Sequence, residues 1–198
     1  SSFDRKKVTE LFREMEFYSL LARLPEAEGG REESQKAVEI PRVYTIINTP
    51  DALDNLVKRL REENSFAFDV ETTGLDPMAV GLVGISISLA QGEAYYIPVG
   101  HTGWGGLLQM PLEQVVNRIK PAMEETGCYK FGHNSKFDIT VLAENGIVVK
   151  EVAFDTMVAA YLLSEKALSL KPLTFNRLGI EMAAITDLIG DGRKQITM

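Results

Sequence analysis

The stretch that decides the fold lies at residues 66–74, which read FAFDVETTG. Side chains alternate between the two faces of a strand, so Asp69 and Glu71 should project together, opposite the apolar residues between them. Two carboxylates held a few ångströms apart repel each other unless a positive charge lies between them. A divalent cation is the simplest such charge, because hard cations such as Mg²⁺ select oxygen ligands. An Asp-x-Glu pair alone more often marks a solvated strand face, so this interpretation depends on the rest of the chain.

A second motif lies at residues 130–138, KFGHNSKFD. Apolar residues from Phe137 onward have helical spacing, and Asn145 followed by glycine is a typical helix end. Asn134 and Asp138 are four residues apart, so they should share a face near the helix N-terminus, where the helix dipole favours a carboxylate. Alone, this pattern is more typical of a helix cap followed by a surface acid. Its position after the Asp-x-Glu strand favours a second contribution to the same metal site.

Together, residues 66–77 and 133–138 resemble the first and second motifs of the DEDD 3′–5′ exonucleases. The resemblance is specific to the proofreading domain of bacterial family-A DNA polymerases, and it covers essentially the whole chain in order. Further matching pieces lie at residues 96–101, 154–157 and 189–197. The resemblance implies an α/β protein with the ribonuclease H-like arrangement, a mixed sheet flanked by helices.

The resemblance also implies a reaction, the hydrolysis of the terminal phosphodiester at a DNA 3′ end with two Mg²⁺ ions, for which Mn²⁺ or Zn²⁺ can substitute. It assigns Asp69 to both metals, Glu71 to the metal that activates water, and Asp138 to the second metal. The positions that match substrate-contacting residues are Thr72, Leu75, Asn134 and Phe137. For Leu75 and Phe137, burial in the core is an equally good interpretation, because apolar residues at such positions are usually buried.

One departure from the family concerns its third motif, Tyr-x-x-x-Asp, which lies downstream of the match at residues 189–197 and is not present in this sequence. We therefore expect a C-terminally incomplete exonuclease domain at residues 41–198. We expect it to follow a helical segment at 1–25, which would succeed a 5′-nuclease domain, and a flexible charged linker at 26–40. The expected partners are single-stranded or frayed DNA 3′ ends and a polymerase domain of the same parent chain.

Two other interpretations remain open. One is a catalytically inert scaffold domain of a family-A polymerase, which the intact Asp69, Glu71 and Asp138 disfavour because a scaffold does not need converging carboxylates. The other is a free-standing DEDD nuclease that acts on RNA. The segment at 1–25 disfavours it, because this segment resembles the polymerase interdomain region.

Composition limits the partners. The net charge of −7 argues against strong general affinity for nucleic acid, so we expect weak, metal-dependent binding to DNA. Cys128 is the only cysteine, which excludes an internal disulfide and fits a bacterial cytoplasm. No apolar run is long enough to span a membrane, and we expect a monomer.

The hydrophobic periodicity places the elements. It predicts strands at 42–47, 66–71, 80–89, 93–99 and 129–131, and helices starting at Thr49 and at about 111–126, 135–145, 153–164 and 169–179. We expect Asp4 to cap the first helix. Asp155 is expected to cap the helix that comes directly after Asp155 in the sequence. His101 is expected to be structural or near the rim of the cleft. His133 precedes Asn134, and a contact with a phosphate is the less favoured of its two interpretations.

Overall fold

The computed structural model describes residues 4, 7–8, 11–12, 15, 42–102, 108–180 and 182–183. Near the N-terminus, the carboxylate of Asp4 accepts a hydrogen bond from Lys7 N at 3.2 Å, which is the contact expected of a helix cap. Residues 7–8 and 11–12 are helical. Most of the expected first helix, the linker at 26–40 and the match at 189–197 lie outside the described residues. None of the described helices is long and apolar enough to cross a membrane.

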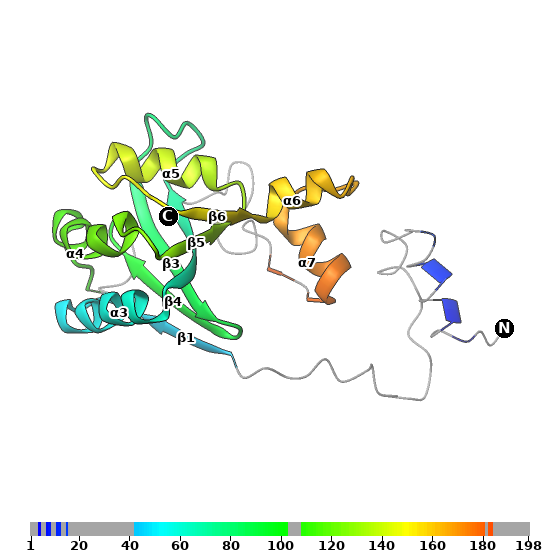
Figure 1. The fold of residues 1–198 in the computed structure, drawn as a ribbon, viewed down its shortest axis with the longest axis horizontal. Coiled ribbons are helices and arrows are strands. Elements are labelled where there is room, and N and C mark those ends of the chain that lie inside the picture. Colours follow the sequence, from blue (N-terminus) through cyan, green and yellow to red (C-terminus); the bar gives the residue numbers. More distant parts are fainter. Residues whose placement is uncertain are drawn as a thin grey trace.

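A six-stranded mixed sheet forms the centre of the described residues, with strand order β1-β4-β3-β2-β5-β6 (Figure 1). Its strands are β1 (Val43–Ile46), β2 (Ser65–Thr72), β3 (Leu82–Ala90), β4 (Glu93–Pro98), β5 (Tyr129–Gly132) and β6 (Val152–Asp155). Strands β2, β3 and β4 pair antiparallel, while β1 lies parallel to β4, and β2, β5 and β6 are mutually parallel neighbours. The strand with the two acids, β2, therefore has a partner on each side.

Five helices accompany the sheet in the described residues. They are α3 (Pro50–Glu63), α4 (Leu112–Glu124), α5 (Ser135–Glu144), α6 (Thr156–Leu162) and α7 (Leu170–Leu178). Helix α3 begins where the sequence predicts, because Thr49 Oγ1 accepts from Ala52 N at 3.4 Å and Pro50 occupies the first turn. Helices α3, α4 and α5 lie together beside the sheet, whereas α6 and α7 extend from the end of β6 (Figure 1).

The core lies between the sheet and the helices α3, α4 and α5. Phe66, Phe68 and Val70 are 2%, 3% and 7% exposed and belong to the same cluster as the apolar residues of these helices. Cys128 is also buried there as a free thiol. The predicted alternation along β2 is confirmed, since the acids between these residues are left on the opposite face.

The prediction of a helix from residue 153 was wrong at its start. Residues 152–155 form β6, which pairs with β5 through Lys130↔Val152 and Phe131↔Phe154, and the helix begins only at Thr156. In so short a segment, pairing with a neighbouring strand decides the conformation. The helical spacing of the residues after 155 gave no information about that neighbour. The other predicted elements agree with the structure to within about two residues at each end.

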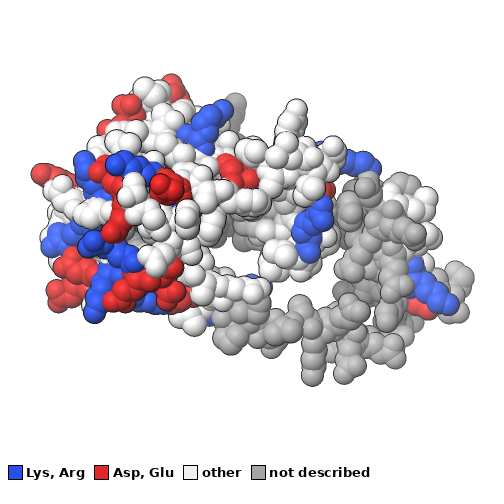
Figure 2. All heavy atoms as spheres, viewed as in Figure 1, with Lys and Arg blue, Asp and Glu red and all other residues white. Residues whose placement is uncertain are grey.

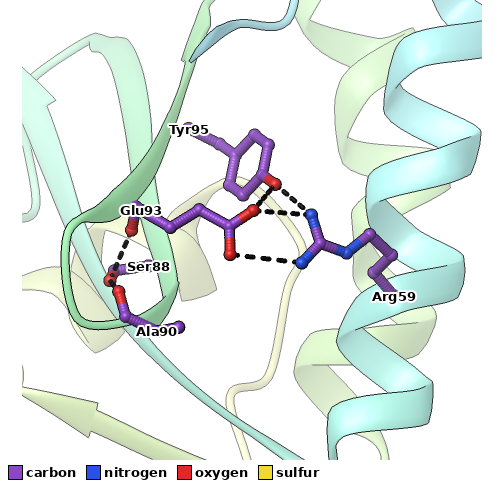
Figure 3. A network of polar contacts seen from close by, with 5 residues as sticks. All are labelled: Arg59, Ser88, Ala90, Glu93 and Tyr95. Carbon is purple, nitrogen blue, oxygen red and sulfur yellow. Dashed lines mark hydrogen bonds and ion pairs between the residues drawn. The ribbon is translucent and has the colours of Figure 1, made fainter. Parts of the chain in front are cut away.

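A polar network ties α3 to the hairpin of β3 and β4 (Figure 3). The guanidinium of Arg59 donates to Glu93 Oε1 at 2.7 Å and to the hydroxyl of Tyr95, which itself donates to Glu93. At the hairpin, Ser88 Oγ donates to the carbonyl oxygen of Glu93 at 2.8 Å. This network holds one side of β4 against α3.

Candidate active site

Two acids occupy the end of β2. Asp69 lies opposite Ser86 and Glu71 opposite Gly84 on the antiparallel neighbour β3. The ladder shifts its register directly after Glu71, where a β-bulge interrupts the pairing. Bulges change the direction of side chains and are frequent next to active sites. This end of β2 therefore has a local geometry that is typical of an active site.

A third acid, Asp138, reaches the same strand from helix α5. Its side chain is 3% exposed, and its Oδ1 accepts a hydrogen bond from Val70 N at 2.9 Å. The pairing of β2 with β5 ends at Ala67, because the chain leaves the sheet at Gly132 to enter α5. Asp138 thus takes the place of a strand partner for Val70, and a buried N–H needs such a partner.

The charges of the three acids interact. Burial and then the negative charge of Asp69 raise the pKa of Asp138 to about 7, although the hydrogen bond from Val70 acts in the opposite direction. Burial and then the charge of Asp69 also raise the pKa of Glu71. Asp69 retains contact with solvent, but the surrounding protein removes enough water to raise its pKa too, while the charge of His133 lowers it. Asp69 therefore interacts electrostatically with both Glu71 and Asp138.

The donor chemistry of this set suits a hard divalent cation. All three groups are carboxylates, and Asp138 is buried beside a second negative charge, which a cation would offset. The spacing is less complete, because no group of three or more His, Cys, Asp and Glu side chains in the described part of the chain lies close enough to hold a metal ion. The residues fit a metal by type, and the described ones do not by themselves form a closed coordination site.

Asp155 fixes the approach to helix α5. Its carboxylate accepts from Ser135 N and Ser135 Oγ, both at 2.7 Å, and from Asn134 N at 3.1 Å. It also accepts from Met157 N and Val158 N at the start of α6, which confirms the predicted cap. Burial alone would raise the pKa of Asp155, but these hydrogen bonds, those from Ser135 first, lower it to about 2.

His133 lies between this cap and the acids. Its Nδ1 is 2.8 Å from Thr156 Oγ1, and that hydroxyl donates to the carbonyl oxygen of Gly132 at 3.2 Å. Because a hydroxyl carries a single hydrogen, which Thr156 donates to Gly132 O, Nδ1–H of His133 is the donor to Thr156. Nε2 is buried and has no hydrogen-bond partner among the described residues. The sequence shows only that His133 precedes Asn134.

The predicted substrate positions differ in their surroundings. Leu75 is 92% exposed, so the core interpretation is wrong for this residue, whereas Phe137 is partly buried and packs against the core. Thr72 donates its hydroxyl to Gly74 O at 2.7 Å in the turn after β2. Asn134 is exposed and precedes α5 with a left-handed backbone (φ 58°), so it does not share a helical face with Asp138 as predicted. Its side chain makes no capping hydrogen bond.

A mixed sheet of this order, with two acids at the end of β2 and a third on the helix after β5, places the chain in the class of ribonuclease H-like folds. Within that class, the model of the 3′–5′ exonuclease family matches residues 44–198. The chain therefore belongs to the 3′–5′ exonuclease family.

Curated relatives are DNA polymerases I. The chain is 39% identical over 228 residues to that of Chloroflexus aurantiacus and 33% identical over 201 residues to that of Pseudomonas aeruginosa. Each match covers 98% of this chain but only 24% and 22% of the relatives, so the chain spans about a quarter of their length.

Solved structures support the fold. The catalytic core of RRP6 from Trypanosoma brucei superposes with a TM-score of 0.58 at 17% identity, covering 72% of this chain and 36% of that one. RNase D from Escherichia coli, described as an exoribonuclease, gives 0.54 at 20% identity and covers 71% of this chain and 35% of that one. These likenesses establish the ribonuclease H-like architecture of the chain.

Proposed function

We propose that this chain is the 3′–5′ exonuclease domain of a bacterial DNA polymerase I and hydrolyses the terminal phosphodiester of a DNA 3′ end in the cytoplasm. The observation that carries the proposal is the electrostatic interaction of Asp69 with Glu71 and Asp138 at the end of β2, which Asp138 reaches from α5. The match to the exonuclease family and the names of the curated relatives support it. The hydrogen-bonded, buried position of Asp138 argues against an inert scaffold, because burying a carboxylate beside another is costly.

The three acids would hold two divalent cations, Mg²⁺ by preference for oxygen ligands. When bound, these cations supply Lewis-acid chemistry, since they offset the phosphate charge and lower the pKa of the attacking water. The protein's own contribution is alignment. Val70 N–H holds one oxygen of Asp138 and leaves the other oxygen for a ligand, while the β2 backbone keeps Asp69 and Glu71 on one face.

The substrate would meet this rim from the turn after β2 and from the start of α5. Leu75, being almost fully exposed, is suited to wedge against a terminal base, and Thr72 to bond the 3′ end. Asn134 and Phe137 would contact the same nucleotide from the other side. Stacking of bases on apolar and aromatic side chains is the usual mode of binding for a frayed single strand.

The charge distribution predicts modest affinity for DNA. On the face shown in Figure 2, basic and acidic side chains are interspersed around α3 and α4 and do not form a separate basic patch. Ion pairs such as Arg61–Glu125 and Arg118–Asp54 account for part of this pattern. We infer that a polymerase domain of the same parent chain supplies most of the affinity for DNA, and that the parent protein is a monomer.

Substitution of Asp69 tests the proposal. In the full-length protein that carries this sequence, Asp69→Ala should abolish 3′–5′ digestion of single-stranded DNA and leave DNA synthesis unchanged. The matched control is Asp51→Ala, which removes an exposed acid from the first turn of α3. Digestion by Asp69→Ala at the wild-type rate would refute the assignment of this residue.

A further inference from the structure

The face of the sheet that carries Glu71 holds a second feature, the side chain of Tyr96 on β4. Glu71 lies opposite Gly84, and Tyr96 lies one strand further, opposite Ser86. A methyl group placed on Gly84 would lie 2.0 Å from Oη and 2.3 Å from Cζ of Tyr96. The tip of the Tyr96 ring therefore occupies the position beside Glu71 that any other residue at position 84 would fill, since directly opposed side chains lie about 5 Å apart on one face.

His101 fixes the hydroxyl of Tyr96. Tyr96 Oη and His101 Nε2 are 2.5 Å apart, and the two rings meet edge to face with centroids separated by 5.6 Å. The backbone of His101 is held in turn by the side chain of Gln109, which accepts from His101 N at 2.9 Å and donates to His101 O at 2.8 Å. The imidazole thus has a defined place after the end of β4.

The same segment is anchored to the bulge beside Glu71. The carbonyl oxygen of Val83, the residue that the β2–β3 ladder skips, accepts from Val99 N at 2.9 Å and from Gly100 N at 3.0 Å. Gly100 approaches the backbone so closely that a side chain there would lie 2.5 Å from Leu82 O. The bulge, the end of β4 and His101 therefore form one connected support around Glu71.

The charges agree with this geometry. Burial first, and then the negative charge of Glu71, raise the pKa of Tyr96 to about 12. Burial lowers the pKa of His101. Tyr96 therefore keeps its hydrogen at neutral pH. Because a phenol carries only one hydrogen, it can point to Glu71 only when His101 Nε2–H donates to Tyr96 Oη.

We propose that Tyr96, held in place by His101, is a positioning residue that orients the carboxylate of Glu71 for cation binding and hydrolysis. The proposal rests on the exonuclease function proposed above and assigns a role to residues 96–101, for which the sequence offered a match without a role. Polar groups that orient a ligating carboxylate typically contribute 10–100-fold to metal affinity or activity.

The test is Tyr96→Phe in the full-length protein, which removes the hydroxyl and keeps the ring over Gly84. We expect kcat for digestion of single-stranded DNA to fall about 10–100-fold with KM unchanged. We also expect the Kd for Mn²⁺, measured by electron paramagnetic resonance without DNA, to rise by a similar factor. The matched control is Tyr95→Phe, since Tyr95 is the next residue and its hydroxyl belongs to the network with Arg59 and Glu93 (Figure 3).

His101→Asn provides a second variant, because it shortens the side chain that holds the hydroxyl. The proposal predicts a loss in the same direction for His101→Asn and wild-type behaviour for Tyr95→Phe. Wild-type kcat and Mn²⁺ affinity in Tyr96→Phe, with Asp69→Ala inactive, would overturn the role of Tyr96 and leave the exonuclease function standing. If the wild-type protein does not digest DNA at all, the exonuclease function is refuted instead. In that case, the Mn²⁺ affinity still tests Tyr96, and an unchanged affinity in Tyr96→Phe would refute its role.

Discussion

At the scale of the residue, Asp138 combines two properties that are rarely found together. Its carboxylate is almost fully buried, yet no cationic side chain is its partner among the described residues. The donors that act on it are the backbone N–H groups of Val70 and of Asp138 itself. A buried acid in this position either keeps its proton or requires a cation. The raised pKa of Asp138 is therefore a property that metal binding would reverse.

This property predicts how stability depends on pH in the absence of divalent metal. The pKa of Asp138 rises from 3.8 to about 7 on folding, so the folded state binds the proton more tightly than the unfolded state does. The free energy of unfolding should fall as pH rises from about 4 to about 7, by up to about 4 kcal/mol from this group. Thermal unfolding of wild type and Asp138→Asn in EDTA measures it, and the variant should lack this part of the slope. Equal slopes in the two proteins would contradict the account.

Which site residues could be predicted depended on how local their signal is. Asp69 and Glu71 are two residues apart in one strand, and Asp138 follows a recognisable helix start, so a short window of sequence reveals them. The contacts of Tyr96 and His133 have no such local signal. Their positions depend on which strands become neighbours and in which register, and the local pattern carries no information about either.

At the scale of the element, Asp155 joins three parts of the chain. It ends β6, caps α6 and accepts the backbone N–H groups of Asn134 and Ser135 at the entry to α5. Because α5 carries Asp138, the geometry of the acid set depends on this carboxylate. The sequence predicted the cap on α6, but it could not predict the link to α5, which requires β6 to lie beside β5.

Asp155→Ala should therefore destabilise the protein by about 2–4 kcal/mol, more than an ordinary cap, since it leaves N–H groups of two helices without a partner. The comparison is Thr49→Ala at the start of α3, which should cost about 1 kcal/mol. Urea unfolding measures both. Because the pKa of Asp155 is lowered to about 2, its contribution should persist above pH 4 and disappear as pH falls toward 2. A cost no greater than that of Thr49→Ala would show that Asp155 does not join the two helices.

At the scale of the whole molecule, two features explain the fold. Apolar and polar side chains alternate along β2, and helices cover the apolar face of the sheet. The apolar side of β2 packs under α3, α4 and α5, and its polar side presents the acids together with Tyr96. The fold class could be predicted from strands that precede helices, but the order β1-β4-β3-β2-β5-β6 could not. Strand order depends on contacts between distant segments, and periodicity within a segment does not report them.

The most direct test of the central claim is the polarity and metal dependence of DNA digestion by the full-length protein. With Mg²⁺, single-stranded DNA labelled at its 5′ end should give a ladder that shortens from the 3′ end, and DNA labelled at its 3′ end should release labelled mononucleotide at once. EDTA should abolish both. Three results would contradict the account: internal cleavage, undiminished 3′ digestion in EDTA, or 3′ ends that stay intact while digestion from the 5′ end persists in Asp69→Ala.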